Sequence, residues 1–233
     1  MNRRIQWMFV TVLICSLTVF TSCSKEDSSP LSEQELFEQE MTAALADAQV
    51  YGPQTQALAQ KVADRFDGRM TELSYKSRES ATRKCISSSL RPYQLRDLAR
   101  TTIAAGWDSM EIKPVISYLV EISNEEGLAG NHRHQTSDYG YWGDVVNLQF
   151  ERLTTEIQVK TYGMFYASYS EDISRHVLGD SIYTIIRTKS GIEPGLSHYY
   201  YEIMRADTSS AATVEYYKQL AIQYHERFEH IKD

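Results

Sequence analysis

Two consecutive segments with alternating polar and apolar residues, 144–152 and 154–161, constrain the fold of this chain more than any other feature. Side chains on a strand point alternately to its two faces, so this alternation predicts two β-strands. In the first segment Val146, Leu148 and Phe150 share one face. A single residue separates the two segments, and we therefore expect an antiparallel hairpin.

The second predicted strand has one apolar and one polar face. Ile157 and Val159 share the face that suits a core, whereas Glu156, Gln158 and Lys160 share the other. A carboxylate, an amide and an ammonium in a row are too polar for ordinary packing. This face is therefore either a solvated edge or the floor of a site.

Helical periodicity dominates the rest of the chain. Helices are predicted over residues 31–50, 53–66, 77–90, 111–122, 162–178, 180–189, 194–205 and 211–231. A further strand is predicted over 95–105, and residues 127–143, which are rich in Gly, His, Ser and Asp, have the composition of a loop. Helices, then a small sheet, then helices indicate an α+β fold.

The N-terminal residues have the pattern of an export signal. Arg3 and Arg4 precede an apolar run over 8–20, which is shorter than the ~20 residues of a membrane-spanning helix. The run ends in Phe20-Thr21-Ser22-Cys23, which resembles a lipobox; the alternative is an ordinary secretory signal with a chance cysteine. We predict a signal peptide over 1–22, lipidation of Cys23, a polar tether over 23–30 and one domain over 31–233.

This reading locates the protein on a bacterial cell envelope, lipid-anchored in the outer membrane. Lys25-Glu26-Asp27 resembles a short export signal of surface lipoproteins and favours the outer surface. Once Cys15 leaves with the signal and Cys23 carries lipid, Cys85 is the one thiol left in the domain, so no internal disulfide is expected. The net charge of −7 provides no basic field that would recruit DNA.

A basic segment, "YKSRESATRK" over 75–84, lies at the start of a predicted helix. Ser77 is the expected N-cap, with Lys76 and Arg78 beside it and Lys84 further along. The backbone N–H groups and the dipole at a helix N-terminus attract anions, and these cations add to that attraction. The segment is either a phosphate cradle or a solvated basic face.

Two carboxylates accompany this basic segment. Asp97 lies in the predicted strand over 95–105, where it must pair with a cation such as Arg96 or Arg100, accept hydrogen bonds or ligate a metal. If that strand lies beside the hairpin, Asp97 and Glu156 project from the same face. Two carboxylates about 5 Å apart repel by roughly 3 kcal/mol at an effective dielectric of about 20. Either Mg²⁺ or a set of Lys and Arg side chains has to compensate.

Five motifs in order resemble the RelA/SpoT-type (p)ppGpp synthetase, a nucleotide pyrophosphokinase domain. They are "KSRESATRK", "LRDLARTTI", "DYGYWGDVVNLQF", "TEIQVKT" and "GLSHYYYE", which span residues 75–202. The third contains Gly140-Tyr141, similar to the family's glycine-tyrosine loop, and the fourth contains Glu156, similar to its glutamate-bearing strand. The chain resembles a short, stand-alone or toxin-like form of this domain.

The resemblance implies a nucleotidyltransferase-like mixed sheet flanked by helices, and a Mg²⁺-dependent transfer of pyrophosphate from ATP to a ribose 3′-hydroxyl. The acceptor would be a guanine nucleotide or an RNA end. Asp97 and Glu156 would be the catalytic and metal-binding residues. The implied nucleotide-binding residues are Lys76, Arg78, Ser80, Lys84, Tyr141, Gln158 and His198.

Two departures from the family pattern lie near the expected nucleotide contacts. Ser74 stands where the family has an arginine, and Trp142-Gly143-Asp144 stands where it has Arg-Ser-Leu-His. These departures favour an alternative in which the chain is a catalytically degenerate lipoprotein that binds a nucleotide or a partner.

Overall fold

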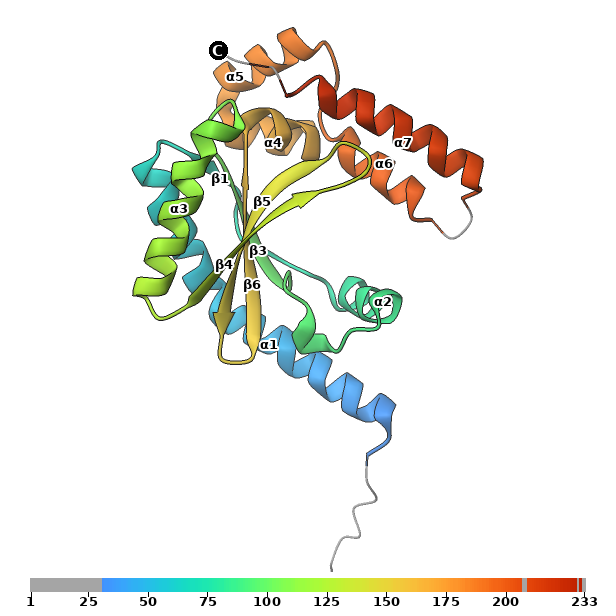
Figure 1. Cartoon of the computed structure of the whole chain (residues 1–233). Coiled ribbons are helices and arrows are strands. Elements are labelled where there is room, and N and C mark those ends of the chain that lie inside the picture. Colours follow the sequence, from blue (N-terminus) through green and yellow to red (C-terminus); the bar gives the residue numbers. More distant parts are fainter. Residues whose placement is uncertain (1–30, 207–208, 230, 232–233) are drawn as a thin grey trace, which may run out of the picture.

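The computed structural model of this 233-residue chain describes residues 31–206, 209–229 and 231. The predicted signal peptide over 1–22, the predicted lipidation site Cys23 and the tether over 23–30 lie outside the described residues. Figure 1 shows a twisted sheet with helices on both sides, which confirms the predicted α+β class. Within the described residues, no helix combines the length and the apolar character needed to cross a membrane.

Six strands form one mixed sheet with the order β1-β3-β6-β5-β4, and β2 pairs with β3 off this path. The strands are β1 (Arg69–Met70), β2 (Ser74–Tyr75), β3 (Ala99–Ala104), β4 (Ala129–Thr136), β5 (Trp142–Phe150) and β6 (Leu153–Lys160). β5 and β6 are the predicted hairpin, with Asn147 opposite Glu156. β3 runs parallel to β6 with Arg100 opposite Glu156, so the two strands that were expected to be neighbours are neighbours.

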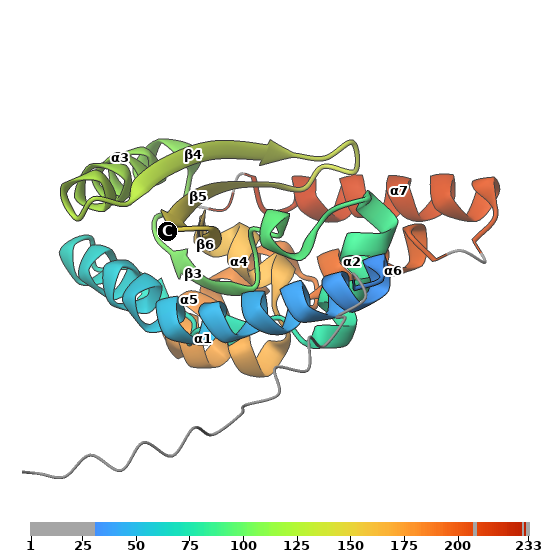
Figure 2. The same ribbon diagram turned by 90° about the horizontal axis from the view of Figure 1, so that it is seen from below.

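Two helices cover the apolar face of the sheet. α1 (Glu33–Arg65) and α3 (Ser109–Glu125) pack against Ile157 and Val159, which are completely buried. Figure 2 shows α3 and the C-terminal half of α1 on one side of the sheet and α2 and α6 on the other. The apolar alternation of the hairpin therefore decides which face becomes the core.

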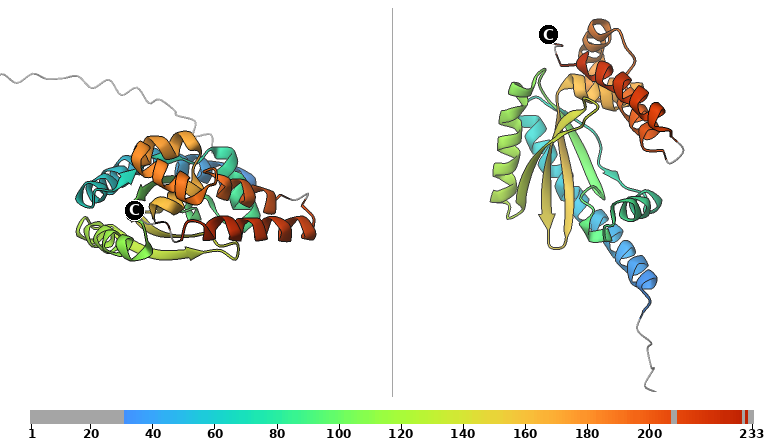
Figure 3. Two further views of the ribbon diagram at one scale, coloured as in Figure 1. Left: turned by 90° about the horizontal axis from the view of Figure 1, so that it is seen from above. Right: turned by 45° about the vertical axis from the view of Figure 1, so that its right-hand side comes forward.

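The remaining helices lie on or beyond the opposite face. They are α2 (Arg78–Ser88), α4 (Tyr162–Ser168), α5 (Glu171–Ser190), α6 (Leu196–Met204) and α7 (Ala211–Glu226), with a short 3₁₀ helix, η1, at Pro92–Gln94. A second core, which includes Phe165, Tyr166 and Phe228, joins α4, α5 and α7 at the end of the sheet. α6 and α7 run side by side, well apart from α2 (Figures 1 and 3). The polar face of β6 lies between these groups of helices.

The predicted break between helices 31–50 and 53–66 is wrong. α1 is continuous through Pro53, although proline removes one helical hydrogen bond. Tertiary packing outweighs this local cost, because α1 buries a long stripe against β3 and β6. A Cβ at Gly52 would lie only 2.7–2.9 Å from atoms of Leu73 and Tyr75, so glycine is needed for this close approach.

The predicted loop over 127–143 is also wrong for most of its length, because it contains β4. This edge strand is polar on both faces, and most of its side chains are exposed or half-buried. It therefore lacks the apolar period by which a strand is found in a sequence. Its pairing with β5 over Ala129 to Thr136 holds it in the sheet.

Other element boundaries also differ from the prediction. β3 begins at Ala99, so Asp97 precedes the strand and does not lie within it. Leu95 and Leu98 are buried in the core around α1 but are not part of β3. The predicted helix over 162–178 ends at Ser168. α5 starts at Glu171 and continues through a kink at Gly179, which joins the remainder to the predicted helix over 180–189.

Candidate functional site

Both predicted acids line one pocket on the polar face of the sheet. We call this pocket of about 460 Å³ the Asp97 pocket. Its charged lining consists of Lys84, Arg96, Asp97, Arg100, Arg133 and Glu156. The pocket therefore combines two carboxylates with four cations, in a chain whose net charge is −7.

Asp97 is held by two lysines from the α2 region. Its Oδ2 lies 3.0 Å from Lys76 Nζ and 2.9 Å from Lys84 Nζ, so its partners are these lysines and not the predicted Arg96 or Arg100. Burial acts to raise the pKa of Asp97, but Lys84 and then Lys76 outweigh it and lower the pKa below the ordinary value. Asp97 is consequently an ionised carboxylate, and its buried Oδ1 has no hydrogen-bond partner within the described structure.

Glu156 is buried on β6, two residues before Gln158 on the same face. Gln158 Nε2 donates to Glu156 Oε1 at 2.7 Å and orients this carboxylate. Beside it on β3, Arg100 occupies the register position opposite Glu156. The polar face of β6 is not a solvated edge, because β6 lies between β3 and β5 and this face lines a pocket.

A second pocket of about 390 Å³ adjoins the first, because Arg100 and Gln158 line both. We call it the Tyr141 pocket. Its aromatic and cationic lining includes Tyr139, Tyr141, Tyr169, Tyr201, Lys160 and His198. Rings of this kind are suited to stacking against a flat heterocycle.

The wall of the Tyr141 pocket is fixed by a buried histidine of α7. His225 Nδ1 donates to the Tyr139 carbonyl at 2.9 Å, and His225 Nε2 lies 2.9 Å from Ser197 Oγ. Burial lowers the pKa of His225, so the ring is neutral. Its Nε2 then accepts a hydrogen bond from the Ser197 hydroxyl. The tautomer therefore follows from the two neighbours.

Lys160 lies at the inner end of the Tyr141 pocket with 3% of its surface exposed. Its Nζ donates to Tyr141 Oη at 2.8 Å and to Ser168 Oγ at 2.9 Å, and it lies 4.7 Å from the centre of the Tyr141 ring. Burial lowers the pKa of Lys160 to about 8. Burial also raises the pKa of Tyr141 to about 12, so this hydroxyl stays protonated.

Three further predicted nucleotide-binding residues, Lys76, Arg78 and Ser80, line neither the Asp97 pocket nor the Tyr141 pocket. Lys76 contacts the site through Asp97. Arg78 Nη1 lies 2.9 Å from Glu38 Oε2, and Arg78 Nη2 donates to Thr42 Oγ1, so Arg78 faces α1 and lines neither pocket. Ser80 donates its backbone N–H to the Ser77 cap and is likewise outside both linings. Their contacts with ATP stay predictions.

Several lining residues were missed from the sequence, among them three cations. Arg133 fell in the segment that was predicted as a loop, and Arg100 was considered only as a partner of Asp97. Lys160 was noted on the polar face of its strand without a role. The alternation that places Glu156 and Gln158 in the site places Lys160 there too, so the signal was present in the sequence.

The two acids fit a divalent ion only in part. Mg²⁺ is commonly held by one or two carboxylates together with substrate phosphates. Asp97, with its unpartnered buried Oδ1, and Glu156 supply such a pair. Across residues 31–206, 209–229 and 231, no group of three or more His, Cys, Asp or Glu side chains is placed to hold a metal. Two carboxylates alone are an incomplete ligand set for Mg²⁺, so the other ligands would have to come from a bound phosphate or from water.

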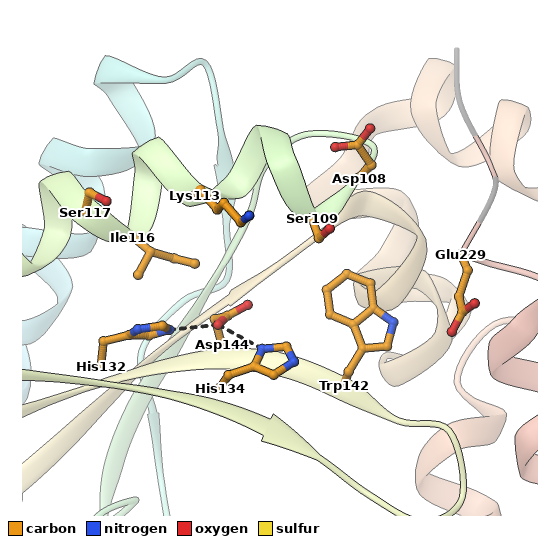
Figure 4. Close-up of a pocket in the computed structure, with 10 residues that line it drawn as sticks. All are labelled: Asp108, Ser109, Lys113, Ile116, Ser117, His132, His134, Trp142, Asp144 and Glu229. Carbon is orange, nitrogen blue, oxygen red and sulfur yellow. Dashed lines mark hydrogen bonds and ion pairs between the residues drawn. The ribbon is translucent and has the colours of Figure 1, made fainter.

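A third cavity, of about 770 Å³, lies on the opposite face of the sheet under α3 (Figure 4). His132 and His134 of β4 both contact Asp144 Oδ1 there, at 2.7 and 3.1 Å. Trp142 also lines this cavity. Two residues that depart from the family pattern, Trp142 and Asp144, thus line this third cavity and neither the Asp97 pocket nor the Tyr141 pocket.

Gly143, between these two residues, faces the Tyr141 pocket. A Cβ at this position would lie 3.1 Å from Tyr141 Oη. Glycine therefore lets the Tyr141 hydroxyl approach the strand, next to Lys160. Of the three residues Trp142, Gly143 and Asp144, Gly143 is therefore the one that contacts the Tyr141 side.

Comparison with known proteins tests the resemblance to a RelA/SpoT-type synthetase domain that the sequence motifs indicate. Over 152 residues the chain is 31% identical to the (p)ppApp synthetase toxin Tas1 of Pseudomonas aeruginosa (strain UCBPP-PA14). The match covers 64% of this chain and 33% of that protein, so the chain spans about a third of the length of this curated relative. No family model matches the chain.

One solved structure supports the same resemblance, and a second is similar to a lesser degree. The type VI effector Tas1, crystallised with its immunity protein, superposes with a TM-score of 0.66 at 25% identity, covering 82% of this chain and 96% of that chain. The small alarmone synthetase 1 from Bacillus subtilis has a TM-score of 0.48 at 15% identity, covering 83% and 92%. The resemblance to a RelA/SpoT-type synthetase domain is thereby confirmed.

Proposed function

We propose that this chain is a pyrophosphokinase that transfers the β,γ-diphosphate of ATP to the ribose 3′-hydroxyl of a purine nucleotide. The observation that carries the proposal is the meeting of Asp97 and Glu156 in one cation-lined pocket, which adjoins a second, tyrosine-lined pocket through Arg100 and Gln158. Two substrates must meet in such a reaction, and the cleft offers two adjoining chambers of different chemistry.

In this mechanism the acceptor 3′-oxygen attacks the β-phosphorus of ATP. The bond between the β-phosphorus and the bridging oxygen to the α-phosphate breaks, and AMP leaves with that oxygen. The proton of the 3′-hydroxyl passes to Glu156, which Gln158 holds in place. A positioned general base of this kind contributes roughly 10²–10⁴-fold to the rate.

The cations of the Asp97 pocket would hold the triphosphate and neutralise its developing charge. Lys84, Arg100 and Arg133 reach the pocket from three different elements. Mg²⁺, held by Asp97 and Glu156 together with the phosphates, would add Lewis-acid stabilisation when bound. Phosphoryl-type transfer depends mostly on positioning and charge neutralisation, which this lining supplies.

The identity of the acceptor nucleotide is a separate part of the proposal. The name of the relative, a (p)ppApp synthetase, favours an adenosine nucleotide, whereas the sequence motifs resemble those of synthetases that use guanosine nucleotides. We propose adenosine nucleotides as the first acceptors to test, ahead of guanosine nucleotides and RNA ends. We further propose that Cys23 carries lipid and anchors the domain to the envelope.

The test is a transfer assay. The purified protein is incubated with γ-labelled ATP, Mg²⁺ and, separately, AMP, ADP, GDP, GTP or tRNA, and products are separated by thin-layer chromatography. We expect a labelled 3′-diphosphate product together with stoichiometric AMP. A folded protein that binds ATP but forms no product with any acceptor would refute transfer and favour the degenerate, binding-only alternative.

A further inference from the structure

Lys160 is the least explained charged group of the cleft. It is 3% exposed, and its two hydrogen-bond partners, Tyr141 Oη and Ser168 Oγ, are both uncharged hydroxyls. Buried lysines are rare unless a carboxylate pairs with them, because the ammonium loses its hydration. Asp97 in the neighbouring pocket, by contrast, has two lysine partners.

An ammonium has three N–H donors, and the two hydroxyls account for two of them. Lys160 also lines the Tyr141 pocket. The neighbouring charged and titratable groups are Tyr141, Tyr169, Arg100, Glu156 and His225. Arg100 repels the ammonium and Glu156 attracts it, but neither appears among its hydrogen-bond partners.

The position of Lys160 along β6 relates it to the acceptor. Glu156 and Lys160 are four residues apart on one face of one strand, which separates their Cα atoms by about 13 Å. If the 3′-hydroxyl lies at Glu156, Lys160 lies further along the same strand face, where it lines the Tyr141 pocket. Phosphates have their own cation-rich chamber around Asp97, whereas the Tyr141 pocket offers rings for stacking.

We propose that Lys160 recognises the purine base of the acceptor in the Tyr141 pocket by donating a hydrogen bond from its ammonium to an accepting atom of that base. This proposal rests on the proposed function, since it takes the 3′-hydroxyl to lie at Glu156. Ring nitrogen N7 of either purine and O6 of guanine are the accepting atoms that a lysine typically contacts on a base edge.

The experiment measures acceptor binding by calorimetry, without turnover, in the presence of a non-transferable ATP analogue. The variants are Lys160→Met and Lys160→Arg, with Tyr141→Phe and Ser168→Ala as matched controls that each remove one hydroxyl partner. Lys160→Met should weaken acceptor binding at least about tenfold, as expected for one charge-assisted hydrogen bond. Binding of the ATP analogue should be unchanged, and circular dichroism checks the fold of every variant.

Modified acceptors identify the contacted atom. The 7-deaza analogues of the adenosine and guanosine nucleotides lack N7, and 2-aminopurine nucleotides lack O6. The wild-type protein should lose about tenfold in affinity for the analogue that lacks the contacted atom, whereas Lys160→Met should bind that analogue and its parent equally. Such a matched loss is not expected of a lysine that only supports the fold.

Three results would overturn the inference. The first is a full loss of acceptor affinity in Tyr141→Phe, which would mean that Lys160 acts only by positioning that ring. The second is weak binding of nucleotides but normal binding of nucleosides by Lys160→Met, which would assign the ammonium to a phosphate. The third is unchanged affinity of Lys160→Met for every acceptor. Acceptor binding that depends on Lys160 but occurs without any transfer would instead refute the proposed function alone.

Discussion

The two adjoining pockets differ in whether their buried charged group has a partner of opposite charge. In the Asp97 pocket the carboxylate is matched by Lys76 and Lys84 at 3.0 and 2.9 Å, and its pKa is lowered. In the Tyr141 pocket the hydrogen-bond partners of Lys160 among the described residues are hydroxyls, and burial lowers its pKa to about 8. The first pocket therefore stabilises the fold through its charges, while the second holds a charge that costs stability.

This difference indicates different tasks. Matched charges hold α2 against the segment before β3 and keep Asp97 ionised at neutral pH. An unmatched buried cation is retained against its desolvation cost, which is common where a ligand supplies the missing partner. We therefore expect variants in the two pockets to differ in the sign of their effect on stability as well as in their effect on turnover.

The largest expected effect is on turnover. Glu156→Gln keeps the size of the side chain but removes the proton acceptor, so kcat should fall about 10²–10⁴-fold while acceptor KM changes little. Steady-state kinetics with ATP in excess measure both constants. Asp144→Asn, which alters a buried carboxylate behind the sheet, is the matched control and should retain turnover. Equal losses in both variants would contradict the assignment.

Lys160→Met should stabilise the protein at pH 7. The lowered pKa means that the folded state binds fewer protons than the unfolded state between about pH 8 and 10.5. The cost of burial is thus fully present below pH 8 and disappears as the pH rises toward 10.5. At ~1.4 kcal/mol for each pKa unit, and after subtracting two lost hydrogen bonds, we expect a gain of about 1–3 kcal/mol at neutral pH.

Urea unfolding at pH 7 and pH 9.5 measures this gain, which should be smaller at the higher pH. The parent and the Lys160→Met variant share the groups around position 160, which are Tyr141, Tyr169, Arg100, Glu156 and His225. The difference in unfolding free energy between the two proteins therefore reports mainly on residue 160 itself. A destabilised Lys160→Met variant would show that Lys160 is a structural residue.

Asp97→Asn should have the opposite sign. It leaves Lys76 and Lys84 facing each other without a counter-charge, and since Lys84 is 42% exposed we expect a discounted loss of about 1–2 kcal/mol at pH 7. The pKa of Asp97 is lowered in the folded state, so its contribution is present above the ordinary pKa and disappears as the pH falls through the folded value. Urea unfolding at pH 7 and pH 3 should therefore show a difference that narrows in acid.

The smallest effect is expected outside both pockets. Arg78→Ala removes an exposed ion pair with Glu38 and should cost about 0.2–1 kcal/mol of stability while leaving kcat/KM unchanged. Lys84→Ala, the matched change inside the Asp97 pocket, should lower kcat/KM. A higher KM for ATP in Arg78→Ala would instead support the sequence-based prediction that Arg78 binds a phosphate of ATP.

Much of the cleft was predictable from local pattern. Alternation over 154–161 placed Glu156, Gln158 and Lys160 on one face, and Ser77 marked the start of α2, because both signals depend only on nearby residues. β4 was not predictable in this way, since an edge strand with polar faces is stabilised by backbone pairing that leaves no apolar period. The continuity of α1 through Pro53 was not predictable either, because it depends on the packing of α1 against β3 and β6.

The sequence by itself determined which face of β6 is polar and which residues begin α2, because strand alternation and helix capping are local properties. Only the tertiary structure decided that Asp97 pairs with Lys76 and Lys84, and that Lys160 is buried without a carboxylate. It also decided that Trp142 and Asp144 point behind the sheet. These outcomes depend on strand order and register, which join residues far apart in the chain.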